Sequence, residues 1–334
     1  MRILFCILII SILLSCQNSR KKNTADTLLS DYSYIPDSSW PQLPKDFVLS
    51  QPTGIGIDTS DHVFVFHRAG RKWVNPFPDS TISMPTILEL DNETGKIINA
   101  WGEGYFIMPH GLTVDKQNNI WVTDVALHQI FKFSHDGKLL LKLGTPKVPG
   151  NDSSHFNLPT DVAVANDGCF YVSDGYGNSR VVKFSASGKY IKAWGTYGKA
   201  QGSFIIPHGI AIDSKQILYV ADRQNNRIQL FDTSGRFIRE IKNNAQVQQL
   251  PSLTMDKNNR IFAIDYDPTK KQDSTVTGST IFLVDSLLQP GHHFGANGTL
   301  PRTTCWFHDI AVDSKGNLYV GDIVGLKLQK FIRK

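Results

Sequence analysis

The clearest feature of the chain is a unit of four short apolar segments separated by polar turns. One copy comprises residues 109–115, 120–124, 130–133 and 139–143, with a glycine-containing turn at 134–138. Apolar and polar residues alternate within the segments, and this period of two predicts β-strands. Every unit is therefore expected to form a four-stranded sheet.

The unit occurs six times, at spacings of 44 to 57 residues. The copies begin at Pro52, Pro109, Pro159, Pro207, Pro251 and Phe307. Repeated sheets of this size are typical of propeller blades rather than of a sandwich, so we predict an all-β fold, a six-bladed β-propeller. The last copy ends at Lys334 after three strands, and we expect a segment near residues 47–49 to supply the fourth strand and close the ring. The unit is similar to the NHL repeat.

The first residues of the chain carry a targeting signal rather than part of the fold. Residues 3–14 are almost wholly apolar but too short to span a bilayer, and Ser15 and Cys16 follow them. This pattern resembles the lipobox of bacterial lipoproteins, whose cysteine becomes lipidated; the alternative is an ordinary signal peptide with a chance cysteine. We expect a lipoprotein signal peptide at 1–15, a lipid-anchored polar tether at 16–43 and the propeller at 44–334. The protein would be exported and attached through Cys16 to a bacterial membrane, on its periplasmic or cell-surface side.

Composition narrows the possible partners. The formal net charge is +5, and the only basic cluster, residues 20–22, falls in the expected tether, so we expect no nucleic-acid partner. Of the four cysteines, Cys6 leaves with the signal and Cys16 takes the lipid. Cys169 and Cys305 remain, and we expect both to be unpaired.

Three histidines share one position of the repeat. The residue that follows each unit's first residue is His110, His208 or His308 in the even units and Thr53, Thr160 or Ser252 in the odd ones. Alternate blades of a six-bladed ring lie about 120° apart, so the three imidazoles should converge in one mouth of the central channel. Three such ligands without a fourth describe an open zinc site. The alternative is three hydrogen-bonded core histidines; other histidines, such as His62 and His135, are expected in turns with no ligand role.

The same register selects two arginines and a tyrosine. Arg68 and Arg223 occupy one position in units one and four, which face each other across the channel, and other units hold no cation there. Two guanidinium groups above a metal suit an anionic substrate, because each can bind a carboxylate through two hydrogen bonds. Tyr176, one residue further along in unit three, should overhang the same mouth. Rim salt bridges for the arginines and a blade-edge role for the tyrosine remain alternatives.

Beyond the repeat, the sequence resembles the lyase domain of peptidylglycine α-amidating monooxygenase, the peptidyl-α-hydroxyglycine α-amidating lyase. The resemblance extends over residues 47–334. It is carried by the stretches 65–68, 109–112, 121–129, 159–164, 171–180, 206–208, 221–223 and 308–309.

The resemblance implies a set of functional residues. It places a catalytic zinc on His110, His208 and His308, the catalytic tyrosine on Tyr176, and the substrate-facing arginines on Arg68 and Arg223. It further implies a structural calcium held by the carboxylate of Asp309 and the backbone carbonyls of Ile55 and Leu112.

The sequence departs from the family pattern at several points. Both partners of each family disulfide are replaced, by Asn157 and Gly177 in one pair and by Tyr219 and Leu230 in the other, and Trp306 replaces a methionine beside the third zinc histidine. The chain has four methionines and no evident copper-binding set, so we expect no copper monooxygenase half in it.

The implied reaction cleaves a small anionic α-hydroxyglycine substrate into an amide and glyoxylate. Zinc would act as the Lewis acid and Tyr176 would accept the hydroxyl proton, with Arg68 favouring the phenolate and Arg223 orienting the carboxylate, or the reverse. One rival is a non-catalytic propeller that serves as a scaffold or ligand-binding module. Another is a zinc hydrolase, for which no carboxylate is clearly placed as general base.

Overall fold

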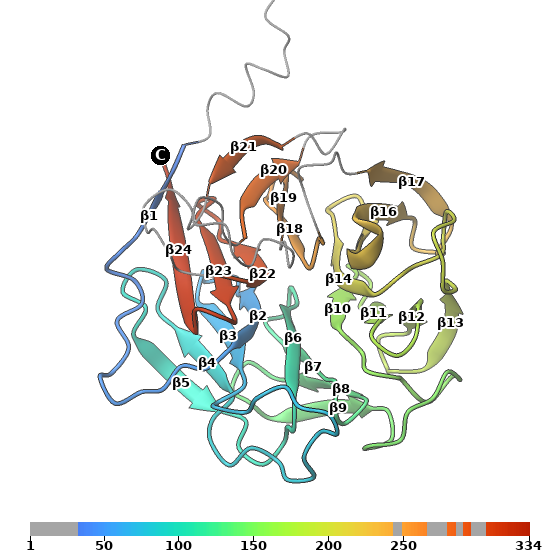
Figure 1. The fold of residues 1–334 in the computed structure, drawn as a ribbon, viewed down its shortest axis with the longest axis horizontal. Helices are drawn as coiled ribbons and strands as arrows, with labels where there is room; N and C mark the ends of the chain where they lie inside the picture. Colours follow the sequence, from blue (N-terminus) through green and yellow to red (C-terminus); the bar gives the residue numbers. More distant parts are fainter. Residues whose placement is uncertain (1–32, 243–248, 266–278, 285–289, 295–304) are drawn as a thin grey trace, which may run out of the picture. The chain divides into compact units, whose positions relative to one another are not determined.

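The computed structural model describes residues 33–242, 249–265, 279–284, 290–294 and 305–334. In this part of the chain, six four-stranded antiparallel sheets are arranged as blades around a common axis (Figure 1). The alternating pattern of each unit therefore forms one blade, and the predicted all-β, six-bladed propeller is confirmed.

The first three blades follow the chain in order. Blade 1 contains β2 (Pro52–Ile57), β3 (Val63–His67), β4 (Ile87–Leu90) and β5 (Ile97–Trp101). Blade 2 contains β6 (Pro109–Val114), β7 (Ile120–Asp124), β8 (Gln129–Phe133) and β9 (Leu139–Leu143). Blade 3 contains β10 (Asp161–Val164), β11 (Phe170–Asp174), β12 (Arg180–Phe184) and β13 (Tyr190–Trp194).

The remaining blades complete the ring. Blade 4 contains β14 (Pro207–Ile212), β15 (Leu218–Asp222), β16 (Arg227–Phe231) and β17 (Phe237–Lys242), with the short 3-10 helix η1 (Arg223–Asn225) after β15. Blade 5 contains β18 (Leu253–Met255), β19 (Ile261–Ile264), β20 (Ile281–Val284) and β21 (Pro290–Phe294). Blade 6 contains β22 (Phe307–Val312), β23 (Leu318–Asp322), β24 (Lys327–Arg333) and β1 (Tyr34–Pro36).

Adjacent blades pack face to face through the apolar residues of the alternating pattern. Between blades 1 and 2, the rings of Phe64, Phe66, Phe106, Phe131 and Phe133 are fully or almost fully buried. Burying one such side chain stabilises a fold by about 1.5–3 kcal/mol before the loss of conformational entropy is counted. The blades are therefore held by one another, and the innermost strands β2, β6, β10, β14, β18 and β22 surround the channel (Figure 1).

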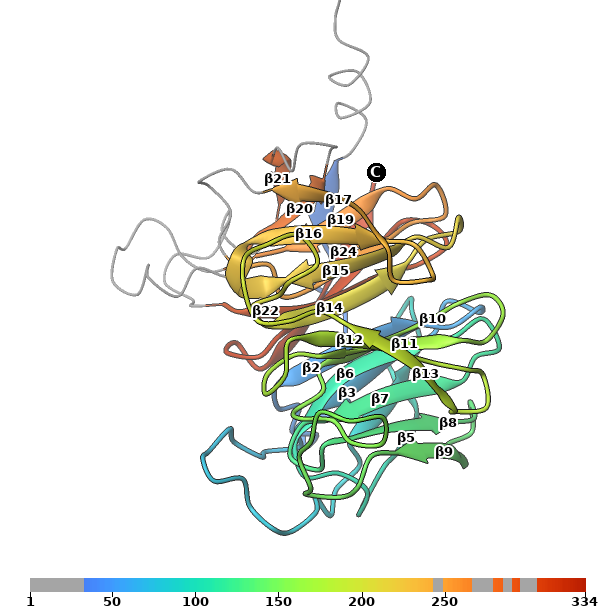
Figure 2. The same cartoon turned by 90° about the vertical axis from the view of Figure 1, so that its right-hand side faces the viewer.

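The ring is closed by a strand from the beginning of the described chain. Tyr34 pairs with Arg333 and Pro36 with Phe331, so β1 is the outer strand of blade 6, beside β24 (Figure 1). Figure 2 shows the same ring turned by 90°. The expectation that residues 47–49 supply this strand was wrong, because those residues form no strand. Residues 34–36 of the expected tether thus belong to the propeller, which begins before residue 44.

An aspartate at the end of a second strand positions the entry to the innermost strand in several blades. The carboxylate of Asp124 accepts the backbone N–H groups of Ile107 and Met108 at 2.7 and 2.8 Å. Asp222 and Asp322 accept the equivalent amides in blades 4 and 6. These bonds fix the chain immediately before the three channel histidines.

The predicted signal peptide and Cys16 lie outside the described residues. Among the residues that are described, no helix is both long enough and apolar enough to cross a membrane.

Candidate metal centre and active site

Each channel histidine sits on a β-bulge of an innermost strand. In blade 2 the pairing moves from Pro109 with Asp124 to Leu112 with Val122, so His110 and Gly111 together oppose a single residue. Equivalent shifts occur at His208 and at His308. A bulge turns a side chain out of the sheet's alternation, and here it turns the imidazole toward the channel axis.

The three rings are oriented by the same hydrogen bond. The Nδ1 atoms of His110, His208 and His308 lie 2.7, 2.8 and 2.7 Å from the carbonyl oxygens of Thr160, Pro251 and Thr53. A carbonyl only accepts, so Nδ1 carries the proton and Nε2 keeps a lone pair. Each carbonyl belongs to the next blade, so each histidine ring is held by a bond between two blades.

A glycine beside two of the histidines permits this close contact. A Cβ atom on Gly111 would lie 2.4 Å from the Thr160 oxygen, and one on Gly209 would lie 2.8 Å from the Pro251 oxygen. Both distances are shorter than real Cβ contacts. The His-Gly pairs of units two and four are therefore a packing requirement of the histidine site.

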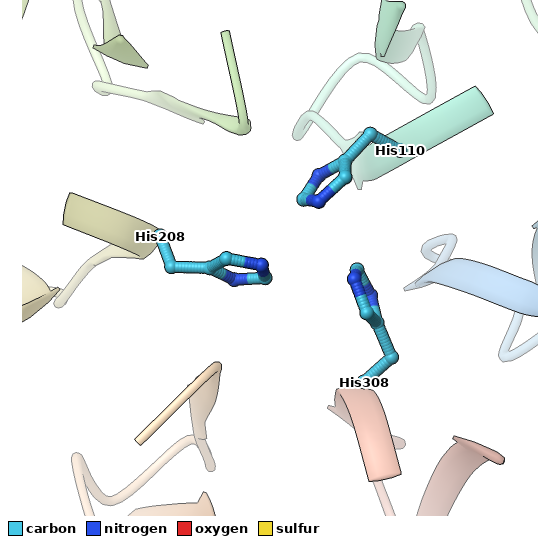
Figure 3. A group of neighbouring side chains, drawn as sticks. All are labelled: His110, His208 and His308. Atoms are coloured by element: carbon cyan, nitrogen blue, oxygen red, sulfur yellow. The ribbon is translucent and has the colours of Figure 1, made fainter. Parts of the chain in front are cut away.

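The three imidazoles converge and are uncharged. Their ring centroids lie 4.6 to 5.0 Å apart, and their ligand nitrogens all lie within 4.8 Å of one another (Figure 3). Burial, together with the charge of Arg68, lowers the pKa of His308 to about 3, and burial holds the pKa values of His110 and His208 well below their usual range. Neutral imidazoles with fixed Nδ1 protons and facing Nε2 lone pairs are the donor set that an open zinc site uses, so these residues fit the metal.

Tyr176 reaches the histidine cluster from blade 3. Its hydroxyl oxygen lies 3.1 Å from His110 Nε2 and 3.0 Å from His208 Nε2. The backbone of the same segment is held by the Tyr176 amide, which donates to the carbonyl of Leu158. The predicted overhang of Tyr176 above the channel mouth is thus present.

Arg223 lies against the other side of this phenol. One guanidinium nitrogen donates to the Tyr176 hydroxyl at 3.3 Å, while Nε donates to Gln249 Oε1 at 3.1 Å. The guanidinium carbon also lies 5.8 Å from the ring centroid of Trp306. Trp306 therefore presents an aromatic face to Arg223.

Arg68 lies in the same mouth and is buried. Its Nε donates to the carbonyl of Pro109 and its terminal nitrogen to Gln51 Oε1, at 3.2 and 3.0 Å. Burial lowers its pKa to about 10, and the nearby Tyr176 opposes this shift. The structure thus brings together all six residues predicted for the metal and the chemistry.

Sequence reasoning missed one aromatic residue of this mouth. Trp73 lies 5.1 Å from the Arg68 guanidinium carbon and 5.5 Å, centroid to centroid, from Tyr176. It belongs to the connection 68–86 between β3 and β4, which the repeat does not contain. The signal that could have found it is the length of this connection, because the corresponding connection in blade 2 is only residues 125–128.

A pair of carboxylates lies next to the histidines in the channel. Asp309 accepts hydrogen bonds from the Ile55 amide at 2.7 Å and from Ser252 Oγ at 2.6 Å, and Asp161 accepts one from the Ile210 amide at 3.0 Å. Burial raises the pKa of Asp309 to about 7, and burial together with Asp309 holds the pKa of Asp161 well above its usual range. Two desolvated carboxylates favour a bound cation, so this location fits calcium; the second carboxylate, Asp161, was not predicted.

A cavity of about 550 Å³ opens on the other side of these carboxylates and contains none of the three histidines. The chemistry-bearing residues instead lie at the narrow constriction that His110, His208 and His308 line together with Asp161 and Asp309.

The two pairs of positions at which the resemblance implies disulfides in the relatives are neighbours in space. The amide of Gly177 donates to the carbonyl of Asn157 at 3.0 Å, and Tyr219 pairs directly with Leu230 between β15 and β16. Cys169 and Cys305 are both free, as predicted.

Comparison with known proteins agrees with the fold and finds similar sequences. A family model described as a 6-bladed beta-propeller matches residues 141–296, and an NHL repeat model matches residues 106–133. The chain is 34% identical over 330 residues to peptidyl-glycine alpha-amidating monooxygenase B of Xenopus laevis, covering 93% of this chain and 37% of that protein. It is also 34% identical over 345 residues to peptidyl-alpha-hydroxyglycine alpha-amidating lyase 1 of Drosophila melanogaster, covering 90% of this chain and 60% of that protein.

Solved structures agree on the fold alone. A streptogramin B lyase structure superposes with a TM-score of 0.59 at 15% identity, covering 92% of this chain and 99% of that one. The chain spans only 31–37% of the length of the vertebrate monooxygenases it matches. The chain is also similar, at 34–40% identity, to several proteins named peptidyl-alpha-hydroxyglycine alpha-amidating lyase, of which it covers 49–60%.

Proposed function

We propose that the chain is a zinc-dependent lyase that cleaves a peptidyl- or acyl-α-hydroxyglycine into an amide and glyoxylate. The observation that carries the proposal is the contact of Tyr176 with His110 and His208, beside two arginines. A scaffold needs no phenol at this point. A lyase needs a proton acceptor next to its metal and a cationic pocket for the substrate carboxylate.

The proposed zinc ligands are His110, His208 and His308, through their Nε2 atoms. Zinc bound there would supply a Lewis acid that lowers the pKa of the substrate hydroxyl. The protein holds the three rings in the required tautomer through the carbonyls of the following blades, which are second-layer partners of the kind that metal-binding histidines use.

Tyr176 is the proposed proton acceptor. The substrate hydroxyl would lose its proton to the phenolate as the carbonyl of glyoxylate forms and the carbon–nitrogen bond breaks. The bonding electrons then go to the amide nitrogen, which takes the proton back from Tyr176, so atoms and charge balance. This transfer is general acid–base catalysis, which contributes about two to four orders of magnitude in rate.

The two arginines would have different roles in the reaction. Arg223 donates to the Tyr176 hydroxyl, so it would hold the proton acceptor in place beside the histidines. Arg68, which makes no hydrogen bond to Tyr176, would bind the substrate carboxylate above Trp73. The contacts thus favour the second of the two role assignments left open by the sequence.

A structural calcium is the second proposed metal, held by Asp309 and by the carbonyls of Ile55 and Leu112. Asp161 would add a second negative charge. Calcium prefers oxygen ligands from carboxylates and backbone carbonyls, and its charge would offset the cost of two desolvated carboxylates.

We further propose that the protein is exported and lipid-anchored through Cys16. Replacing Cys16 with Ser should move the protein from the membrane fraction to the soluble fraction or block its processing. Unchanged partition would contradict the anchor.

The activity is tested with an N-acyl-α-hydroxyglycine as substrate. Zinc-loaded wild-type protein should release glyoxylate and the corresponding amide in equal amounts, and His208→Ala should abolish zinc binding at the channel site and turnover. Zinc-loaded protein that leaves the substrate intact would contradict the proposed function.

A further inference from the structure

A second cluster of metal-binding side chains contains none of the channel histidines. Asp58 follows β2, His62 lies in the turn before β3, and Glu89 lies on β4, all in blade 1. His135 lies in the turn between β8 and β9 of blade 2. The cluster therefore joins two neighbouring blades.

The four ligand atoms are arranged around a common point. His62 Nδ1 lies 2.9 Å from Glu89 Oε1 and 3.4 Å from Asp58 Oδ2, and His135 Nε2 lies 3.0 Å from Asp58 Oδ2 and 3.7 Å from Glu89 Oε1. All four atoms lie within 4.8 Å of one another. The ligands of a tetrahedral zinc at about 2.0–2.2 Å are separated by about 3.3–3.6 Å, which is close to these distances.

One atom of the cluster lacks a hydrogen bond. His62 Nδ1 is buried and has no hydrogen-bond partner despite its short distance to Glu89. The ring nitrogen is close to the carboxylate but lacks the geometry of a hydrogen bond to it. A cation bound by both groups explains this position better than a direct hydrogen bond between them.

In blade 1 the cluster takes the place of a hydrogen bond that blades 2, 4 and 6 share. Asp115, Asp213 and Asp313 occupy the position of Asp58 and, like it, accept two amides of the following turn through Oδ1. Their Oδ2 atoms accept a hydrogen bond from an aromatic side chain six residues later, namely Trp121, Tyr219 or Tyr319. In blade 1 this aromatic residue is Phe64, which has no donor.

Blade 1 also has an acidic residue at a position where three other blades have a lysine. Phe64 pairs with Glu89, whereas the equivalent cross-strand position holds Lys132, Lys183 or Lys330 in blades 2, 3 and 6. The side chains of Asp58 and Glu89 are only 1% and 6% exposed, and no lysine or arginine in the described part of the chain forms an ion pair with either. Two buried carboxylates side by side are costly unless a cation compensates them.

We propose that Asp58, His62, Glu89 and His135 form a second metal site, which binds a divalent ion of the zinc type. Imidazole nitrogens select zinc and similar transition metals over calcium and magnesium. Four protein ligands leave no open position, so the site is structural and clamps blade 1 to blade 2. The ion can enter from solvent, because the side chains of His62 and His135 are 32% and 41% exposed.

The test is the zinc content of the full chain after loading with zinc and dialysis against metal-free buffer. Glu89→Gln and His135→Ala should each hold one zinc fewer than the wild type, while His208→Ala should lose a different zinc. The variant that combines His208→Ala with Glu89→Gln should hold none. His155→Ala is the matched control, because His155 pairs with the exposed Asp152 at 2.9 Å outside the cluster, and its zinc content should equal that of the wild type.

A second measurement, the melting temperature, tests whether the ion stabilises the contact between blades 1 and 2. Adding zinc to the metal-free His208→Ala variant should raise its melting temperature, and the same addition should have no effect once Glu89→Gln or His135→Ala is added, because only the folded state forms the site. His135 is in an exposed turn, so its replacement keeps the fold available for the test. Wild-type zinc content in both Glu89→Gln and His135→Ala would overturn the proposal, whatever the channel site binds.

Discussion

The channel histidines divide two tasks between their two ring nitrogens. Nδ1 of His110, His208 and His308 binds a carbonyl of the neighbouring blade, and Nε2 faces the channel. The sequence predicted which histidines converge, because the repeat supplies an internal register. It could not predict the carbonyl partners, since a backbone oxygen leaves no mark on the residue type.

His67 is a buried histidine outside the zinc set, and it should make the metal-free protein sensitive to acid. Burial lowers its pKa to about 4. The unfolded chain binds a proton on His67 below a pH of about 6.5, whereas the folded chain does so only below about 4. The free energy of unfolding therefore falls as the pH is lowered from about 6.5 to 4, by at most about 3 kcal/mol. In denaturant unfolding at a series of pH values, His67→Leu should show a shallower loss between pH 7 and 4. Parallel curves for the two proteins would contradict this prediction.

The two arginines should respond differently to substitution. Arg223→Ala removes the donor to Tyr176, so we expect mainly a lower kcat, because the proton acceptor is no longer held in place. Arg68→Lys should mainly raise KM, because a lysine cannot reproduce the two-pronged contact with a carboxylate. The measurement is kcat and KM for glyoxylate release. A raised KM with unchanged kcat in Arg223→Ala, together with a lowered kcat in Arg68→Lys, would reverse the assignment.

At the scale of the element, the innermost strand with its bulge is the unit that builds the site. His110 and Gly111 oppose one residue of β7, and the glycine lets the strand approach Thr160 of blade 3. The strands were predictable from the period of two. The bulges were not, because a bulge follows from the pairing of two strands rather than from the pattern of either one.

Gly111→Ala tests this packing. Its Cβ would lie 2.4 Å from the Thr160 oxygen, the same oxygen that accepts from His110 Nδ1. The strands must separate, so we expect zinc affinity to fall at least about tenfold, with the 10–100-fold loss that is typical when second-layer partners are removed. Zinc titration of the metal-free protein gives the affinity. Wild-type affinity in a folded Gly111→Ala protein would contradict the role of the glycine.

The loop 68–86 contains a site residue that the repeat could not predict. Trp73 lies beside Arg68 and Tyr176. The corresponding connections of blades 2, 3, 4 and 6 are only residues 125–128, 175–179, 223–226 and 323–326, so they offer no equivalent position from which Trp73 could be predicted. Asp161 was missed for a different reason. Its residue type was visible, but its proximity to Asp309 depends on two strands of different blades meeting at the channel.

At the scale of the whole molecule, the ring depends on β1. The three-residue strand Tyr34–Pro36 has no alternating pattern and contains a proline, so its sequence gave no strand signal and the predicted closing segment was wrong. Proline is tolerated there because an outermost strand needs hydrogen bonds on only one side.

Removing β1 should destabilise the ring. A chain that starts at residue 38 lacks the pairing with β24, including the bond from the Asp37 amide to the Lys330 carbonyl at 2.9 Å and the bond from the Tyr34 hydroxyl to the Gly316 carbonyl. At about 1 kcal/mol for each hydrogen bond, we expect a loss of about 2–4 kcal/mol and a tendency of the open edge to associate. The control is a chain that starts at residue 33. Equal melting temperatures for the two chains would show that β1 does not close the ring.

The central claim is that Tyr176 acts as the proton acceptor of a lyase, and glyoxylate release by Tyr176→Phe tests it most directly. The substitution removes one oxygen, so zinc content and melting temperature should remain close to those of the wild type. Turnover of an N-acyl-α-hydroxyglycine should fall by about two to four orders of magnitude, the usual contribution of a positioned general base. A folded, zinc-loaded Tyr176→Phe protein that releases glyoxylate at the wild-type rate would contradict the account.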